Sequence, residues 1–189
     1  MARLVVLDME MGGLDPYKHS VLSLGAVIWQ DRQIIDSFEV FVREEQIVAE
    51  PAAIDVNKID LQWLREHGCP PSDAVHRFHD FLARHFGALP GQEKIVLAGH
   101  NLHVDLGFLR RLYGFAGLSL DQYFSHRVLD TAGVLRFLHL AGKLPVASAG
   151  LGDALTYFGI ESASSVRHTA VGDATLTAHL LNKLFDVIA

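Results

Sequence analysis

Apolar residues form three runs in the first quarter of the chain, over residues 3–10, 21–30 and 33–42. The runs are rich in Leu, Val and Ile, and only Asp31-Arg32 separates the second from the third. Apolar, β-branched runs bounded by turn residues are typical of strands, and short connections favour antiparallel pairing. The pattern therefore predicts a three-stranded antiparallel meander.

From Pro51 onward the apolar residues recur at helical spacing. The clearest helix has Ser72 as its N-cap and ends near Gly87, and short buried strands are expected over 94–98 and 127–130. Further helical segments are predicted over residues 54–64, 102–113, 131–141, 149–158 and about 171–188. A meander followed by alternating helices and strands predicts an α/β domain with a mixed sheet flanked by helices.

Composition limits the function classes that this chain fits. Its 189 residues, 50% hydrophobic and 20% charged, are expected to form one domain, residues 1–189. The net charge of −6 excludes a polybasic nucleic-acid coat. Cys69 is the only cysteine, so an intrachain disulfide is excluded. No apolar run is long enough for a membrane span or a signal peptide, so we expect a soluble, cytoplasmic protein.

Two carboxylates lie two residues apart at the end of the first predicted strand. Because side chains alternate along a strand, Asp8 and Glu10 project from the same face. Like charges that close repel each other unless a cation lies between them, which favours a divalent metal. The pair also fits an exposed strand edge, so alone it does not decide the matter.

Two other segments supply chemistry at the ends of predicted elements. Asp105 follows a predicted strand and opens a helix, where sites of α/β sheets are found, although a first-turn aspartate also favours the helix dipole. His168 and Asp173 are five residues apart and converge only if His168 lies on a non-helical lead-in to the last helix. Four carboxylates with one histidine suit Mg²⁺ or Mn²⁺ together with a general base, and hence phosphate-ester hydrolysis.

The remaining histidines give no metal site. His100 and His103 lack further ligands at a matching spacing, so a structural role is the better interpretation. His76, His79 and His85 share one predicted helix without carboxylates at ligand intervals. We expect these three to form a solvated helix face.

Three motifs, taken together and in order, resemble those of the DEDDh family of 3′-to-5′ exonucleases. Residues 6–16 look like the first motif, D-x-E-T-T-G-L-D-P, and residues 98–109 look like the second, with its H-N-x-x-F-D core. Residues 168–178 look like the third, H-x-A-x-x-D-A-x-x-T-A. The resemblance spans nearly the whole chain and implies a ribonuclease-H-like α/β fold, with a five-stranded mixed sheet of one antiparallel meander plus parallel strands.

The resemblance also implies roles, position by position. Asp8, Glu10, Asp105 and Asp173 would bind two divalent cations, Mg²⁺ or Mn²⁺, and His168 would take the proton from the attacking water. The implied reaction releases nucleoside 5′-monophosphates from the 3′ end of single-stranded DNA, RNA or short oligonucleotides. The implied substrate contacts are Met9, Met11, Gly12, Leu14, His100, Asn101 and Phe108.

Departures from the family pattern affect substrate contacts rather than metal binding. Met11 and Gly12 stand where the family often has threonines, and Val104 replaces the usual Phe. A non-catalytic module of the same fold that binds nucleic acid or a polymerase is one alternative, and a hydrolase of small nucleotides is another. The retained like charges speak against the first, because they would destabilise a bare scaffold. A DNA polymerase partner and a homodimer both stay open.

Overall fold

The computed structural model describes residues 3–90, 93–145, 150–161 and 168–188. Five strands form one sheet in the order β3-β2-β1-β4-β5. The strands are β1 Arg3–Met11, β2 Val21–Gln30, β3 Gln33–Phe41, β4 Leu97–Gly99 and β5 Leu129–Asp130. Strands β1, β2 and β3 pair antiparallel, whereas β4 pairs parallel to both β1 and β5. This confirms the predicted meander with added parallel strands.

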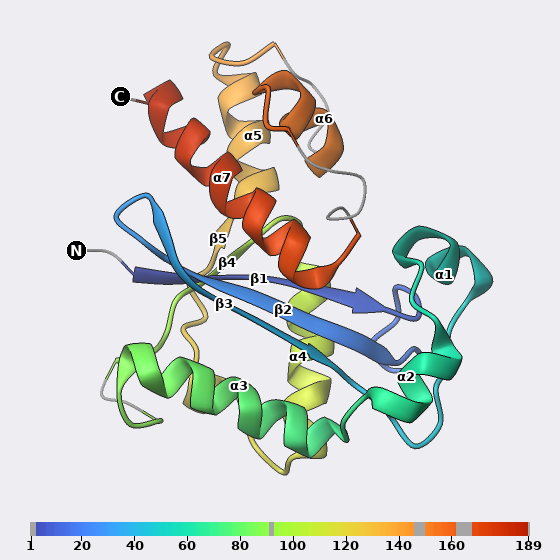
Figure 1. Cartoon of the computed structure of the whole chain (residues 1–189). Coiled ribbons are helices and arrows are strands. Elements are labelled where there is room, and N and C mark those ends of the chain that lie inside the picture. The colour runs from blue at the N-terminus through green and yellow to red at the C-terminus, as the bar shows by residue number, and fades with distance from the viewer. Residues whose placement is uncertain (1–2, 91–92, 146–149, 162–167, 189) are drawn as a thin grey trace.

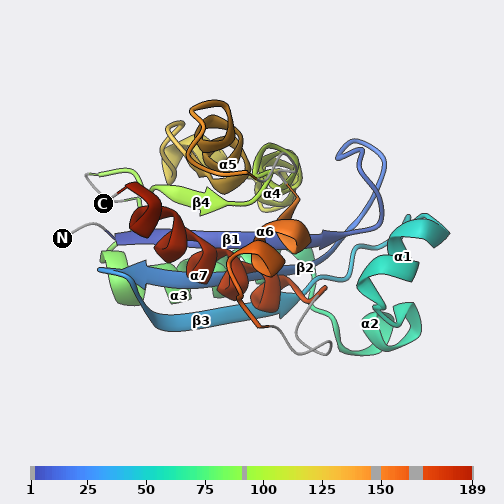
Figure 2. The ribbon, with the colours of Figure 1, turned by 90° about the horizontal axis from the view of Figure 1, so that it is seen from above.

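Helices cover both faces of the sheet (Figures 1 and 2). They are α1 Pro51–Asn57, α2 Leu61–His67, α3 Pro71–Phe86, α4 His103–Phe115, α5 Thr131–Leu140, α6 Leu151–Tyr157 and α7 Ala170–Ile188. Helices α3 and α4 lie on one face, and α7 crosses β1 and β2 on the other, with α5 and α6 beside it. Within the described ranges, no helix combines the length and hydropathy needed to cross a bilayer.

Alternation along β1 decides which side chains enter the core. Val5, Leu7 and Met9 are buried against the face that carries α3 and α4. Val6 is buried against the opposite face, under α7. Asp8 and Glu10 follow Val6 at the same two-residue period, so both carboxylates lie on the α7 side of the sheet.

Several boundaries differ from those that the sequence predicted. Helix α3 begins at Pro71, not after a Ser72 cap: Pro70 is at the N-cap position, where its side chain accepts no hydrogen bond from the helix N–H groups. Proline suits the first helical position because its missing N–H would have no partner there. Strand β4 is also shorter than expected, and the hairpin residues Asp31 and Arg32 both have positive φ, 50° and 68°. Two successive positive φ values are typical of the tight turn that matches the twist of a β-hairpin.

Candidate active site

Three carboxylates converge where β1 meets the first turn of α7. The ligand oxygens of Asp8, Glu10 and Asp173 all lie within 4.8 Å of one another. Asp173 is 7% exposed, so its charge is largely removed from water. Among the described residues, this is the one group of three or more His, Cys, Asp or Glu side chains that lie close enough together to bind a metal ion.

A glycine lets α7 come close enough to the sheet to complete this group. Gly25 of β2 pairs with Asp8 across the β1–β2 ladder. A Cβ at Gly25 would lie 2.1 Å from both the carbonyl carbon of Ala170 and the nitrogen of Val171. Only hydrogen fits there, so the backbone of α7 rests directly on β2. This contact fixes the distance between Asp8 and Asp173.

Local hydrogen bonds fix the start of α7. The Thr169 hydroxyl accepts from the N–H of Gly172 at 3.1 Å, as an N-cap does, and its carbonyl accepts from the N–H of Asp173 at 2.9 Å. From the neighbouring strand, the Glu39 carboxylate accepts from the N–H of Val171 at 3.3 Å. His168 lies before the helix, with φ of 63° and an exposed imidazole. The non-helical lead-in that the residue types predicted is therefore present.

Asp105, the fourth predicted metal ligand, is not among the three clustered carboxylates, but its side chain contacts the β1 backbone between Asp8 and Glu10. Strand β4 ends at Gly99 and pairs with β1 only at Val5 and Val6. Helix α4 contacts the part of β1 that extends beyond this pairing. The Asp105 carboxylate accepts from the N–H of Met9 at 2.9 Å, between the two β1 carboxylates. Burial raises the pKa of Asp105 to about 7, and the negative charge of Asp130 adds to this, although the hydrogen bonds from its own N–H and that of Met9 oppose it.

These carboxylates fit hard divalent cations. Carboxylate oxygens are the ligands that Mg²⁺ and Mn²⁺ prefer, and a cation between the three clustered groups would offset their repulsion. A nearby cation would also favour the charged form of Asp105 against its burial. The three clustered carboxylates are therefore compatible with binding of a divalent cation.

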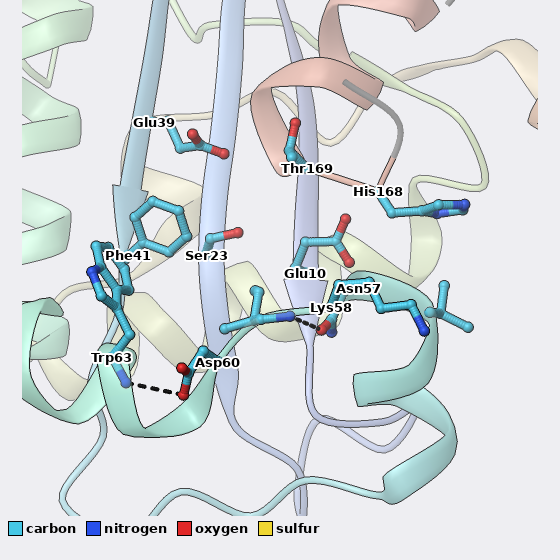
Figure 3. Close-up of a pocket in the computed structure, with 12 residues that line it drawn as sticks. Glu10, Ser23, Glu39, Phe41, Asn57, Lys58, Asp60, Trp63, His168 and Thr169 are labelled. Atoms are coloured by element: carbon cyan, nitrogen blue, oxygen red, sulfur yellow. Dashed lines mark hydrogen bonds between the residues drawn. The ribbon is translucent and has the colours of Figure 1, made fainter. Parts of the chain in front are cut away.

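Two cavities flank Glu10. The smaller, of about 340 Å³, lies between the β1–β2 loop and α1 and is lined by the predicted contacts Met9, Met11 and Leu14. Leu14 is 80% exposed at its rim. The larger, of about 580 Å³, is lined by Glu10, His168 and Thr169 on one side and by residues of β2, β3 and the α1–α2 segment on the other (Figure 3).

The other predicted contacts are not all at these cavities. Phe108 is fully buried in the core, because its side of α4 packs on the sheet, so it does not face the site. His100 is also buried, and its Nδ1 lies 3.0 Å from the Thr131 hydroxyl, which itself donates to the carbonyl of Gly99. Asn101 is exposed, with φ of 56°.

Gly12 is buried, and it is required by packing rather than by substrate. A Cβ at Gly12 would lie 2.3 Å from the carbonyl oxygen of Val48. Glycine in place of the family's threonine therefore allows the backbone at Gly12 to lie close to the backbone at Val48. Side-chain contacts to substrate from position 12 are absent, since glycine has none.

Sequence reasoning missed most of the wall of the larger cavity. Trp63 and Phe41 lie opposite Glu10 and His168 in Figure 3, and Ser23 lies between the two sides. Ser23 and Phe41 occupy the same cross-strand row as Glu10, through the pairs Glu10–Ser23 and Ser23–Phe41. The strand register was the signal that could have found them, because Glu10 was already identified.

Comparison with known proteins is consistent with this geometry. The family model described as an exonuclease, of the RNase T type, matches residues 5–181. The chain belongs to this exonuclease family. It is 28% identical over 179 residues to a PolC-type DNA polymerase III of Listeria monocytogenes and 25% identical over 187 residues to that of Thermotoga petrophila. These alignments cover 95% and 99% of this chain but only 11% and 12% of the polymerases.

Solved exonuclease structures have the same fold as this family member. Escherichia coli exonuclease I in complex with a dT13 oligonucleotide superposes with a TM-score of 0.79 at 17% identity, over 98% of this chain and 43% of that one. Exonuclease I of Methylocaldum szegediense gives 0.77 at 19% identity, over 100% and 43%. The chain thus spans under half the length of these proteins.

Proposed function

We propose that this exonuclease-family chain is a 3′-to-5′ exonuclease that hydrolyses the terminal phosphodiester of single-stranded nucleic acid. The observation that carries this is the convergence of Asp8, Glu10 and Asp173 within 4.8 Å, beside a cavity that His168 also lines. Three clustered carboxylates would only lower the stability of a protein without a metal-binding or catalytic role, because they repel each other. The products would be nucleoside 5′-monophosphates.

The chain's own residues supply binding and proton transfer. Asp8, Glu10 and Asp173 would hold the divalent cations, with Asp105 orienting the second one. Bound cations of this kind activate water and stabilise the leaving 3′-oxygen. His168 is exposed beside Glu10, where its imidazole can take the proton of the attacking water. Its backbone is set by the turn before α7, which keeps the imidazole outside the helix.

Single-stranded substrates are supported by charge and by the structural neighbours. The net charge of −6 disfavours a tight grip on duplex DNA. Exonuclease I, which has the same fold, was solved with dT13 and with dA16. The PolC-type relatives are DNA polymerases, so we include a polymerase among the candidate partners. A homodimer and a cytoplasmic location stay predictions, and the proposal covers both DNA and RNA substrates.

Product analysis tests the proposal. Matched DNA and RNA oligonucleotides labelled at the 5′ end are incubated with the protein and Mg²⁺ or Mn²⁺. We expect a ladder that shortens from the 3′ end, with mononucleotide release, and no ladder with Asp8→Ala. His168→Ala should keep its metal affinity by calorimetry and lose about a hundredfold or more in turnover.

Two results would reject parts of this proposal. No shortening of either polymer, with metal binding confirmed, would reject the exonuclease in favour of a binding module or a small-molecule hydrolase. Unchanged turnover in His168→Ala would assign the general base to another group while leaving the exonuclease in place.

A further inference from the structure

The β1–β2 loop, residues 12–20, is folded around a buried imidazole. His19 is 4% exposed, whereas Leu14 and Tyr17 of the same loop are 80% and 97% exposed. The His19 Nδ1 accepts from the N–H of Asp15 at 3.1 Å, and the N–H of His19 donates to the Asp15 carbonyl at 2.8 Å. A Cβ at Gly13 would lie 2.5 Å from this Nδ1, so the loop backbone closes directly over the ring.

The other nitrogen of this imidazole faces the start of α1. Nε2 lies 3.0 Å from the carboxylate of Glu50, the N-cap residue of α1. A backbone N–H can only donate, so Nδ1 is the acceptor toward Asp15 and the proton of the neutral ring is on Nε2, next to this carboxylate. The N–H of Glu50 donates to the carbonyl of Gly12 at 2.6 Å, at the other end of the loop. The side chain and the backbone of Glu50 therefore both join the loop to α1.

A buried ion pair joins the same loop to α4. Glu44 is 5% exposed, and its carboxylate accepts from the guanidinium of Arg111 at 2.6 Å. The same carboxylate accepts from the N–H of Val21 at 2.9 Å and from the hydroxyl of Ser20 at 3.1 Å. Arg111 of α4 also donates to the carbonyl of His19. Charge-assisted hydrogen bonds are short and directional, so this pair fixes the end of the loop relative to α4.

We propose that His19, Glu44 and Arg111 are positioning residues that hold the β1–β2 loop in the one arrangement in which it binds the 3′ end of the substrate. The inference rests on the proposed function, and none of the three side chains lines either cavity beside Glu10. They act through Leu14, the loop side chain at the rim of the smaller cavity. Because Leu14 is exposed, its position depends on the loop backbone, which these three side chains hold.

Kinetics on oligonucleotides separate positioning from a loss of stability. If His19→Ala leaves the loop correctly placed in about a tenth of the molecules, KM rises about tenfold. Saturating substrate selects that arrangement, so kcat should stay within about twofold of the wild-type value. A variant that had merely lost folded protein would show the reverse, a lower kcat at unchanged KM. Arg110→Ala is the matched control, since Arg110 is the exposed neighbour of Arg111 and pairs with Asp121; it should change neither constant.

The ion pair is best removed as a pair. Arg111→Ala alone would leave the Glu44 carboxylate buried without its cation and would destabilise the fold. Arg111→Met combined with Glu44→Gln leaves no such charge, and a thermal scan checks that the double variant is folded. We expect its KM to rise as that of His19→Ala does. His19→Gln, whose amide nitrogen can replace Nε2 beside Glu50, should recover part of the loss.

A double-mutant cycle tests whether the effect passes through Leu14. Leu14→Ala should raise KM. In that background His19→Ala should add nothing further, because the substrate then gains nothing from an ordered loop. Additive effects, or a wild-type KM in Leu14→Ala, would overturn the proposal.

Binding without cleavage distinguishes this inference from the proposed function. Fluorescence anisotropy of a labelled oligonucleotide is measured in Ca²⁺, a hard cation that carboxylates also bind. A rise in Kd for His19→Ala but not for Arg110→Ala, in a protein that shortens no oligonucleotide, would reject the exonuclease and keep the positioning role. An active exonuclease with a wild-type KM in either His19→Ala or the ion-pair variant would reject the positioning role and keep the enzyme. Neither cleavage nor binding by the wild type would reject both.

Discussion

At the residue scale, the clustered carboxylates oppose stability in the absence of a cation. Asp8, Glu10 and Asp173 hold their ligand oxygens within 4.8 Å, and Asp173 is nearly buried. Repulsion between such groups is retained only where it serves a function. Stability of the metal-free protein and activity should therefore respond in opposite directions when one of these charges is removed.

Asp8→Asn should stabilise the protein in EDTA and abolish its activity. Relief of about 1 kcal/mol of repulsion corresponds to a rise in Tm of roughly 2–4 °C for a domain of this size. The same variant should lose most of the further rise in Tm that Mn²⁺ gives the wild type, since ligand binding stabilises only by affinity for the folded state. Differential scanning calorimetry with and without Mn²⁺ measures both effects.

Asp80→Asn is the matched control, because Asp80 is exposed on α3, on the opposite side of the sheet. It should leave both the metal-free Tm and the Mn²⁺-dependent rise near the wild-type values. A fall in the metal-free Tm of Asp8→Asn would contradict the repulsion argument.

The sequence was enough to predict the site residues whose positions depend on local patterns. The D-x-E spacing and strand alternation were enough to place Asp8 and Glu10 on one face, and the weak helix formers before Asp173 were enough to put His168 outside α7. Trp63 and Ser23 were not predicted as site residues. The positions of Trp63 and Ser23 in the cavity depend on strand register and on the path of α1 and α2. Neither can be predicted from a local sequence pattern.

At the element scale, the close backbone contact between α7 and β2 controls the geometry of the site. Gly25→Ala should push the first turn of α7 away from the sheet, because its Cβ would overlap the backbone at Ala170 and Val171. Overpacking of this kind costs typically 1–3 kcal/mol, and displacement of Asp173 should lower kcat by at least tenfold. Urea unfolding and the oligonucleotide assay measure the two effects.

Gly114→Ala provides a matched glycine replacement. Gly114 is exposed on α4, and a Cβ there would meet nothing within 4 Å. Alanine favours a helix over glycine by up to about 1 kcal/mol, so this variant should be as stable as the wild type or more so, with unchanged kcat. Wild-type kcat in Gly25→Ala would show that the close contact does not position Asp173.

The α3 histidines show where helical periodicity misleads. Only His76 of the three is exposed, whereas His79 bonds the Tyr113 hydroxyl at 2.9 Å and His85 bonds the Asp36 carboxylate at 2.8 Å. The expectation of a solvated face was therefore wrong for two of them. Their partners lie on α4 and β3, far along the chain, so the spacing within α3 could not reveal these contacts.

The hydrogen bond between His85 of α3 and Asp36 of β3 predicts a pH dependence of stability. The hydrogen bond from His85 lowers the pKa of Asp36 below its usual value. The contact therefore stabilises the fold above about pH 4, the pKa of an unfolded aspartate, and is lost as the pH falls through the lower folded value. Because Asp36 is partly exposed, we expect less than about 1 kcal/mol.

Asp36→Asn isolates this contribution. In urea unfolding at pH 6 the variant should be less stable than the wild type, and the difference should shrink toward pH 3. A difference that stays constant over this range would show that the carboxylate charge is not what stabilises the contact.

At the scale of the whole molecule, the order of elements predicted the antiparallel meander and the added parallel strands, but not the order of the strands in the sheet. A meander with short connections can pair only with its neighbours, and the later short strands can then add only in parallel through helices. These rules leave open whether the next strand joins β1 or β3, and the structure places β4 beside β1, in the order β3-β2-β1-β4-β5. The two cavities could not be predicted in this way, because each forms between segments that the sheet brings together from distant parts of the chain.

The charge of the molecule as a whole predicts how substrate affinity responds to salt. Sixteen Lys and Arg residues against 22 Asp and Glu residues leave a net charge of −6, and Lys58 is the lysine that lines the larger cavity. A protein that grips 6–10 phosphates loses about 10³–10⁵ in affinity between 50 and 200 mM salt. A chain with this acidic balance and one lysine among the described residues of the cavity is expected to contact few phosphates.

The KM for a single-stranded oligonucleotide should therefore rise less than about tenfold over that range of salt, which corresponds to at most a few phosphate contacts. Initial rates at fixed free Mg²⁺, with KCl varied, measure the slope of log KM against log salt. Lys58→Ala should make this slope shallower, by an amount expected for one contact, whereas Trp63→Ala removes no charge and should leave the slope unchanged. A steep slope in the wild type would instead indicate an extended phosphate-binding surface, which the acidic balance of this chain does not predict.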